Sequence, residues 1–297
     1  MSEREIGFIG LGRMGSGMAR NLLGKVPGLL VFDPLAEAMA PLVEAGATAV
    51  DGPAAMAETC DLIFLCLPFA PEVRQVLFGE GGIVSAGRPL TVVDTTTLDR
   101  MDALAIAEEA ASPGIAYWDC PISGMPFRAE NGTLTTMFGG TAEAFADVQP
   151  YLKTFGEDTI HGGPIGSGQA MKALNNIIYN VNIAALAEVL PLAVAVGLDP
   201  NEVAKLVTSA SSRSFASEYF VPRMMARQFD KDFTMDDAYK DIVNVQRMGV
   251  ETRASLPVVN AMISTYQTAI ADGHGNEPKS AMIKVYEKAL GVTFSAE

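Results

Sequence analysis

The stretch "GSGQAMKALNN" contains a lysine and an amide at a spacing that suits proton transfer. Lys172 and Asn176 are four residues apart, so on a helix both side chains lie on one face and can contact one ligand. Burial lowers the pKa of a lysine from about 10.4 toward the range in which it exchanges a proton near neutral pH. Lys172 is therefore a candidate general acid and base for a hydroxyl group. The residues also allow a lysine whose stem lies on an ordinary helix while its ammonium reaches solvent.

A second candidate site is the segment "DCPISG", where a small hydroxyl residue and a glycine follow a strand-like run. The hydroxyl of Ser123 and the backbone N–H groups around Gly124 can donate hydrogen bonds to a carboxylate. A tight turn uses the same residue types, so these residues by themselves indicate either an anion site or a turn.

A third candidate site lies in "IGFIGLGRMGSGMARNLL", where an apolar run leads into three glycines and then into a helix-like stretch. Gly10 allows a tight turn, Gly12 lets the backbone approach a pyrophosphate, and Gly15 lets the helix pack on the strand. The N-terminus of that helix offers N–H groups to phosphate oxygens. The pattern predicts a dinucleotide-binding loop, although a plain glycine turn has similar spacing. The predicted cofactor-binding residues of the loop are Gly10, Leu11, Gly12, Arg13, Met14 and Gly15.

The next apolar run, "GLLVFDP", ends in Asp33, eighteen residues after Gly15. A carboxylate at that place accepts hydrogen bonds from the ribose hydroxyls of a dinucleotide and repels a 2'-phosphate. Asp33 therefore predicts NAD as the cofactor, with NADP disfavoured. Its other interpretation is a helix cap or a turn former before Pro34.

The elements that position these residues follow two different patterns. Up to about residue 160, short apolar runs alternate with helix-like stretches, which is typical of a mainly parallel sheet. From Gly166 onward the strand signal fades and one long apolar helix is predicted, followed by a helix that begins near Asp199 or Pro200. We therefore expect an α/β domain over residues 1–165 and an all-α domain over residues 166–297.

Composition narrows the class of partner. The chain has 297 residues, is 49% hydrophobic and carries a formal net charge of −14, so a nucleic acid or an anionic membrane surface is disfavoured and a small molecule is favoured. The apolar stretch 183–198 is interrupted by Glu188 and Pro191, which argues against a membrane span.

The cysteines and histidines bear on the cellular compartment and on metal binding. Three widely spaced cysteines favour buried reduced thiols and hence a cytoplasmic protein. The two histidines, His161 and His274, lie in separate glycine-rich turns, so no metal site is expected.

With "IGFIGLGRMGSGMARNLL", "CLP", "VDTTT", "DCPISG", "GTLTTMFGG" and "GSGQAMKALNN" in this order, nearly the whole chain resembles the β-hydroxyacid dehydrogenase family. This family includes the 3-hydroxyisobutyrate dehydrogenases and tartronate semialdehyde reductases. The resemblance implies a Rossmann-like N-terminal domain joined by a long interdomain helix to an all-helical C-terminal domain. It also implies a homodimer or homotetramer that interconverts a small 3-hydroxy acid and its semialdehyde with a nicotinamide cofactor.

The resemblance assigns roles to several residues. It makes Lys172 the catalytic lysine and Asn176 its neighbouring amide, with Asn175 as the other amide in that turn, and it gives the substrate carboxylate to Ser123 and Gly124.

Further resemblance-based assignments concern the cofactor. Leu67 and Pro68 of "CLP" are implied to line it, and Thr97, together with Thr96, to approach the nicotinamide; threonines at a strand end are otherwise helix caps. Lys240 of "FTMDDAYKDIVN" is implied to reach the cofactor from the helical domain, or else is a surface lysine among acids.

The chain departs from the family after "ISG", where Met125, Pro126, Phe127 and Arg128 replace the usual small residues. Arg128 can bind a second anionic group of the substrate in a bidentate manner, or can lie on the surface.

Two other functions compete with a 3-hydroxyacid dehydrogenase. An imine reductase shares the implied architecture, but that group usually lacks a lysine at the position of Lys172. A non-catalytic dinucleotide sensor would keep the fold, but the presence of Lys172, Asn176 and Ser123 together argues against it.

Overall fold

A computed structural model describes residues 4–230 and 233–296. The chain separates into two compact units, Met1–Lys172 and Ala173–Glu297, and the division falls inside one continuous helix, α8 (Ser167–Ala195).

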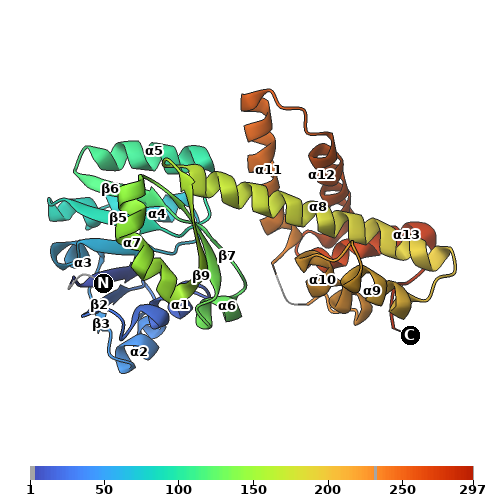
Figure 1. The fold of residues 1–297 in the computed structure, drawn as a ribbon, viewed down its shortest axis with the longest axis horizontal. Helices are drawn as coiled ribbons and strands as arrows, with labels where there is room; N and C mark the ends of the chain where they lie inside the picture. Colours follow the sequence, from blue (N-terminus) through green and yellow to red (C-terminus); the bar gives the residue numbers. More distant parts are fainter. Residues whose placement is uncertain (1–3, 231–232, 297) are drawn as a thin grey trace. The chain divides into compact units, whose positions relative to one another are not determined.

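The first unit is built on one sheet (Figure 1). Its strand order is β3-β2-β1-β4-β5-β6-β8-β7, and β9 pairs with β8. Strands β3, β2, β1, β4, β5 and β6 pair with one another in parallel, β8 is antiparallel to β6 and β7, and β9 is parallel to β8. The predicted mainly parallel sheet is thus confirmed. The strands are β1 (Ile6–Ile9), β2 (Leu29–Phe32), β3 (Thr48–Ala49), β4 (Leu62–Leu65), β5 (Leu90–Asp94), β6 (Ile115–Asp119), β7 (Ile122–Ser123), β8 (Leu134–Gly139) and β9 (Gly156–Gly163).

Two of these strands carry no apolar run. Strand β3 is two exposed residues, and β9 is the largely exposed sequence "GEDTIHGG". Hydrophobic periodicity therefore gives no signal for either, although β9 directly follows helix α7 (Ala142–Phe155) and pairs with β8 over most of its length.

Both faces of the central strands are buried, which explains why their sequences are continuously apolar. Along β1, Phe8 packs with α1 and α7 on one face, whereas Ile9 packs with α3, α4 and α5 on the other. Figure 1 shows these helices on the two sides of the sheet. The helices of this unit are α1 (Gly15–Leu22), α2 (Ala36–Glu44), α3 (Pro53–Thr59), α4 (Ala70–Phe78), η1 (Ile83–Ala86), α5 (Arg100–Ala111), α6 (Pro126–Glu130) and α7 (Ala142–Phe155).

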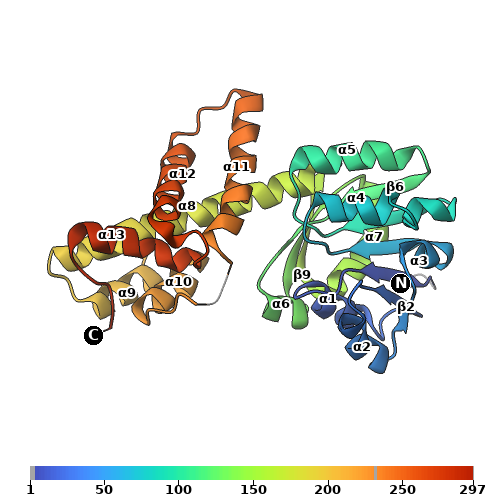
Figure 2. The ribbon, with the colours of Figure 1, turned by 180° about the vertical axis from the view of Figure 1, so that it is seen from behind.

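The second unit is helical over the residues described, as predicted from Gly166 onward. Figure 2 shows it from behind, with α11 and α12 side by side. Residues of α8 such as Ile183 and Leu190 form its core with Phe220 of α10 and Tyr266 of α12. Its helices after α8 are α9 (Pro200–Ser209), α10 (Phe215–Met225), α11 (Met235–Thr252), α12 (Pro257–Ala269), η2 (Ile270–His274), η3 (Lys279–Met282) and α13 (Ile283–Leu290).

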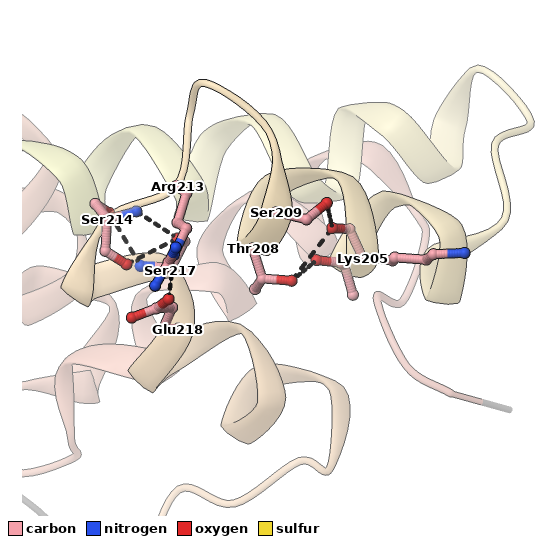
Figure 3. Close-up of polar contacts among 8 residues, drawn as sticks. Lys205, Thr208, Ser209, Arg213, Ser214, Ser217 and Glu218 are labelled. Atoms are coloured by element: carbon pink, nitrogen blue, oxygen red, sulfur yellow. Dashed lines mark hydrogen bonds and ion pairs between the residues drawn. The ribbon is translucent and has the colours of Figure 1, made fainter.

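Local signals set several helix boundaries in this unit. The side chain of Asp199 accepts hydrogen bonds from the N–H groups of Asn201 and Glu202, so the predicted cap of α9 is confirmed. Figure 3 shows the next boundary, where Ser214 and Ser217 cap the start of α10 reciprocally and Arg213 pairs with Glu218.

Helix α8 is long and apolar enough, by length and composition, to cross a membrane. Ile177, Ile183, Ala184, Ala187 and Leu190 are nevertheless buried against the other helices of the second unit. A core helix of a helical domain has the same length and hydropathy, so this feature is weak evidence for a span.

Candidate active site

The glycine loop follows β1 and has the geometry that a bound dinucleotide requires. Gly10 has a φ of 92°, and a Cβ there would lie 2.2 Å from the carbonyl oxygen of Cys66. A Cβ at Gly15 would lie 1.9 Å from the carbonyl oxygen of Gly10, so α1 starts in direct contact with the strand end. At Gly12, in contrast, a Cβ would have no heavy atom of the described chain within 4 Å. The loop is thus closed on the protein side and open at Gly12, which fits the close approach of a pyrophosphate.

Asp33 follows β2 and holds the glycine loop in place. One carboxylate oxygen accepts the N–H of Leu11 at 2.8 Å, and the other accepts the N–H of Leu35 at 2.9 Å. The turn-forming role before Pro34 therefore occurs together with a contact to the loop. The half-buried carboxylate lies beside the loop, where the ribose of a dinucleotide is expected, and Arg13 is exposed on the same loop.

The loops after β4 and β5 are neighbours because these strands are parallel and adjacent. The N–H of Leu67 donates to the hydroxyl oxygen of Thr96 at 3.0 Å, and Leu67 Cδ2 would lie 3.0 Å from a Cβ at Gly10. Pro68 is exposed and Thr97 is half-buried beside these residues. Helix α5 is capped by Asp99, so neither threonine serves as its cap.

Lys172 and the "DCPISG" turn, fifty residues apart in sequence, meet at the edge of the sheet. The Nζ atom of Lys172 donates a 2.7 Å hydrogen bond to the carbonyl oxygen of Ile122, the residue before Ser123. Gly124 has a φ of 143°, and a Cβ there would lie 2.7 Å from Leu134 Cδ2. The half-buried ammonium thus lies next to a turn whose hydroxyl and N–H groups can bind a carboxylate.

Sequence reasoning missed three buried side chains around this edge: Asp94, Asp119 and Gln169. Asp94 accepts the hydroxyl of Tyr117 at 2.6 Å and the N–H of Thr96 at 2.9 Å. Burial raises the pKa of both Asp94 and Asp119 to about 6. The available signal was their position at the ends of "LTVVD" and "IAYWD", where a charged residue closes an apolar run.

The departure at residues 125–128 forms a short helix, α6, close to that turn. The stem of Arg128 lies 3.2 Å from a Cβ at Gly124, and its guanidinium donates to the carbonyl oxygen of Thr133 and lies 3.8 Å from the carboxylate of Glu157. Arg128 is therefore half-buried and paired rather than a freely exposed surface residue, whereas Phe127 is exposed.

Helix α6 is also packed against the helix of the glycine loop. The side chain of Asn21 in α1 donates to the carbonyl oxygens of Ala129 and Glu130, and a Cβ at Gly17 would lie 2.9 Å from the backbone of Ala129. The departure thus changes a segment that contacts α1 as well as the turn at Gly124.

The remaining predicted residues belong to the second unit. Asn176 donates to the carboxylate of Asp241 at 3.0 Å, and Asn175 donates to the amide oxygen of Asn176 at 3.4 Å. The side chain of Lys240 lies outside the part of the chain that the structure describes.

The three cysteines are free thiols, and burial raises the pKa of Cys60 to about 12 and that of Cys66 to about 11. Burial also raises the pKa of Cys120, so all three stay protonated at neutral pH. Within residues 4–230 and 233–296, no three residues of His, Cys, Asp and Glu form a group suited to a metal ion.

Comparison with known proteins gives two family matches that together cover most of the chain. Residues 5–163 match the NAD binding domain of 6-phosphogluconate dehydrogenase, and residues 166–286 match the NAD-binding domain of NADP-dependent 3-hydroxyisobutyrate dehydrogenase.

Individual relatives match nearly the whole chain. The chain is 38% identical to 2-(hydroxymethyl)glutarate dehydrogenase of Eubacterium barkeri, over 98% of this chain and 97% of the relative. It is 30% identical to the mitochondrial 3-hydroxyisobutyrate dehydrogenase of Bos taurus, over 95% and 87%. Among solved structures, 3-hydroxyisobutyrate dehydrogenase of Mycobacterium tuberculosis with L-serine superimposes with a TM-score of 0.83 at 28% identity, over 95% of this chain and 99% of that one.

Proposed function

Because this chain belongs to the β-hydroxyacid dehydrogenase family and is an NAD(P)-dependent 3-hydroxyacid dehydrogenase-like oxidoreductase, we propose that it interconverts a small 3-hydroxy acid and its semialdehyde, with Lys172 moving the hydroxyl proton. The observation that supports this proposal most directly is the 2.7 Å hydrogen bond from Lys172 Nζ to the Ile122 carbonyl, next to Ser123. It puts a titratable amine beside a turn suited to a carboxylate.

The proposed chemistry divides between the cofactor and the chain. A bound nicotinamide accepts a hydride from the alcohol carbon or returns it to the aldehyde. The hydroxyl of Ser123 and the N–H groups at Gly124 hold the substrate carboxylate. Lys172 removes the hydroxyl proton during oxidation and returns it during reduction. Asn176, one helical turn further along α8, orients the hydroxyl without titrating.

The cofactor in this proposal is NAD. Asp33 lies beside the glycine loop, and a 2'-phosphate on the adenosine ribose would meet its carboxylate. The eight residues after Asp33, "PLAEAMAP", contain no arginine or lysine that would compensate that repulsion. The remaining residues of the cofactor site in this proposal are those of the glycine loop with Leu67, Pro68, Thr96 and Thr97, and Lys240 from the helical unit.

The substrate in this proposal carries a second anionic group. Arg128 lies beside Gly124, and its guanidinium has five N–H donors, so it can keep the Thr133 carbonyl and also contact a carboxylate or sulfonate. Glu157, its partner, is 67% exposed and can turn away into solvent. The name of the Eubacterium barkeri relative describes a dicarboxylate that is also a 3-hydroxy acid, which supports this substrate class.

We further infer a cytoplasmic homodimer or homotetramer. Helix α8 exposes Leu174, Ile178, Val189 and Leu192 at helical spacing, and Val196 follows its last residue; each is about half exposed or more. Several exposed apolar side chains along one helix favour a contact with another subunit.

A substrate screen tests the proposed function. The protein is mixed with NAD and in turn with 2-(hydroxymethyl)glutarate, 3-hydroxyisobutyrate and L-serine, and NADH formation is followed by absorbance. We expect turnover with at least one 3-hydroxy acid and the highest kcat/KM for the dicarboxylate. Reduction of a cyclic imine without turnover of any hydroxy acid or semialdehyde would instead support the imine reductase alternative.

A further inference from the structure

The first turn of α8 lies directly on the sheet. A Cβ at Gly168 would be 2.2 Å from the carbonyl oxygen of Met137 in β8 and 2.8 Å from a carboxylate oxygen of Asp119. A Cβ at Gly139 would be 2.3 Å from the other oxygen of Asp119. Glycines at these two places leave just enough room for the carboxylate between the helix and the strand.

Asp119 supplies the cap that α8 lacks in its own sequence. The N–H groups at a helix start have no partner within the helix, and the side chain before the first turn usually accepts them. Gly166, which precedes α8, has no side chain. Instead, the two carboxylate oxygens of Asp119 accept the N–H groups of Gly166 and Gln169, each at 2.7 Å, from the end of β6. These two bonds tie the helix start to one strand.

Gln169 ties the same turn to the loop that follows β5. Its side chain is 1% exposed; its amide oxygen accepts the N–H of Leu98 at 3.0 Å and its amide nitrogen donates to the carbonyl of Thr96 at 2.7 Å. Thr96 in turn accepts the N–H of Leu67. A continuous run of hydrogen bonds therefore joins the loops after β4 and β5 to the start of α8.

Lys172 follows Gln169 by three residues, so its position depends on how the first turn is anchored. A helix bound at its start to the end of β6 and to the loop after β5 can neither slide along its axis nor rotate without breaking buried hydrogen bonds, each of which leaves an unsatisfied group. Displacements of about 1 Å at a reacting group can lower a rate by about a hundredfold.

We propose that Asp119 and Gln169 are positioning residues that hold Lys172 beside Ile122 and Ser123 by fixing the first turn of α8 on the sheet. Both side chains act on Lys172 through α8, because their hydrogen bonds go to backbone groups at the start of this helix and in the loop after β5. The inference rests on the proposed function, in which Lys172 moves the hydroxyl proton.

The test is a double-mutant cycle between Gln169→Met and Lys172→Ala. We expect Gln169→Met to lower kcat by about ten- to a hundredfold at saturating substrates, while the Kd for NAD changes less than about threefold. In the Lys172→Ala background the same change should leave the residual kcat within about twofold, because there is no lysine left to displace.

A control and a second readout separate positioning from loss of stability. Thr154→Val removes a buried hydroxyl of the same unit that donates to the Tyr151 carbonyl within α7, and should leave kcat unchanged. In Asp119→Asn, amide hydrogen exchange over residues 166–169 should accelerate, because an amide group can accept only one of the two N–H groups.

Gln169→Glu provides a variant that keeps the side-chain size. The ionised carboxylate of this variant still accepts the N–H of Leu98, but it has no proton to donate to the carbonyl oxygen of Thr96 and repels that oxygen. The protonated carboxyl group donates a hydrogen bond to the Thr96 carbonyl oxygen. The ratio of the variant's kcat to that of the parent should therefore rise as the pH falls, with Asp94 and Asp119 as the nearby carboxyl groups that titrate in both proteins.

The outcomes distinguish the two proposals. If Lys172→Ala keeps normal turnover, the proposed proton transfer is wrong. If Lys172→Ala loses turnover but Gln169→Met stays within about twofold of the parent kcat, or lowers kcat by the same factor with and without Lys172, the positioning inference alone is wrong.

Discussion

Lys172 Nζ and the carbonyl oxygen of Ile122 are joined by a 2.7 Å hydrogen bond, although the two residues are fifty positions apart. This bond attaches the amine of α8 to the strand that leads into Ser123 and Gly124. It brings together two sequence motifs that are far apart along the chain.

Replacing Lys172 with alanine should lower kcat for the best hydroxy acid by at least about a hundredfold, because general acid and base catalysis contributes on the order of 10² to 10⁴. Lys172→Met, which keeps the stem, should behave alike. Binding of NAD, measured by titration of protein fluorescence, should stay nearly unchanged because the glycine loop and Asp33 are intact. Near-normal turnover of either variant would assign the proton transfer to another group.

Asp33 should make the protein prefer NAD in kcat/KM. Asp33→Asn removes the charge and should lower the ratio of kcat/KM with NAD to kcat/KM with NADP. The change should come chiefly from a higher kcat/KM with NADP, because the 2'-phosphate no longer meets a carboxylate. Glu37→Gln, an exposed carboxylate in the following helix, is the matched control. A parent enzyme that uses NADP equally well would contradict the assignment.

Arg128→Ala should raise KM most for doubly anionic substrates, by about tenfold or more, since a charge-assisted hydrogen bond contributes about 1.5–3 kcal/mol. Singly charged 3-hydroxy acids should show little change. Arg74→Ala, which removes an exposed arginine paired with Glu109, serves as the control. If Arg128→Ala leaves the KM of every substrate unchanged, Arg128 makes only its contacts with Thr133 and Glu157 and does not bind the substrate.

Stability should depend on the protonation of Asp94, whose pKa burial raises to about 6. Between about pH 4 and pH 6 Asp94 then holds more of its proton in the folded than in the unfolded state, so its contribution to the free energy of unfolding falls as the pH rises through this window. Urea unfolding should show a shallower fall for Asp94→Asn than for the parent, whereas the exposed control Glu58→Gln should keep the parent slope. Equal slopes in all three proteins would contradict the prediction.

The exposed apolar side chains of α8 should mediate self-association. Light scattering at micromolar concentration should give a dimer or tetramer for the parent and a smaller species for Leu192→Glu, because a charge at a buried interface is costly. Val43→Glu, at a similarly exposed apolar residue of α2, should keep the parent mass. A monomeric parent would contradict the predicted self-association.

Several features of this protein were determined by the sequence alone, because the forces involved act between near neighbours. Gly10 and Gly15 mark the turn after β1, Asp199 caps the helix that starts next to it, and the apolar runs at residues 62–65 and 90–94 are strands buried on both faces. The motifs that resemble the family are also short runs of neighbouring residues. The α/β class of the first domain and the all-α class of the second could therefore be predicted from the sequence.

Only the tertiary structure decided the contacts between distant segments. Strand β9 is polar and exposed, so it is a strand through pairing with β8 and not through its own pattern. Asp119 caps a helix that begins almost fifty residues later, and Gln169 reaches two loop residues more than seventy positions earlier. Local periodicity carries no information about such partners, because a buried polar side chain is stabilised by whichever group the folded chain brings within hydrogen-bond distance.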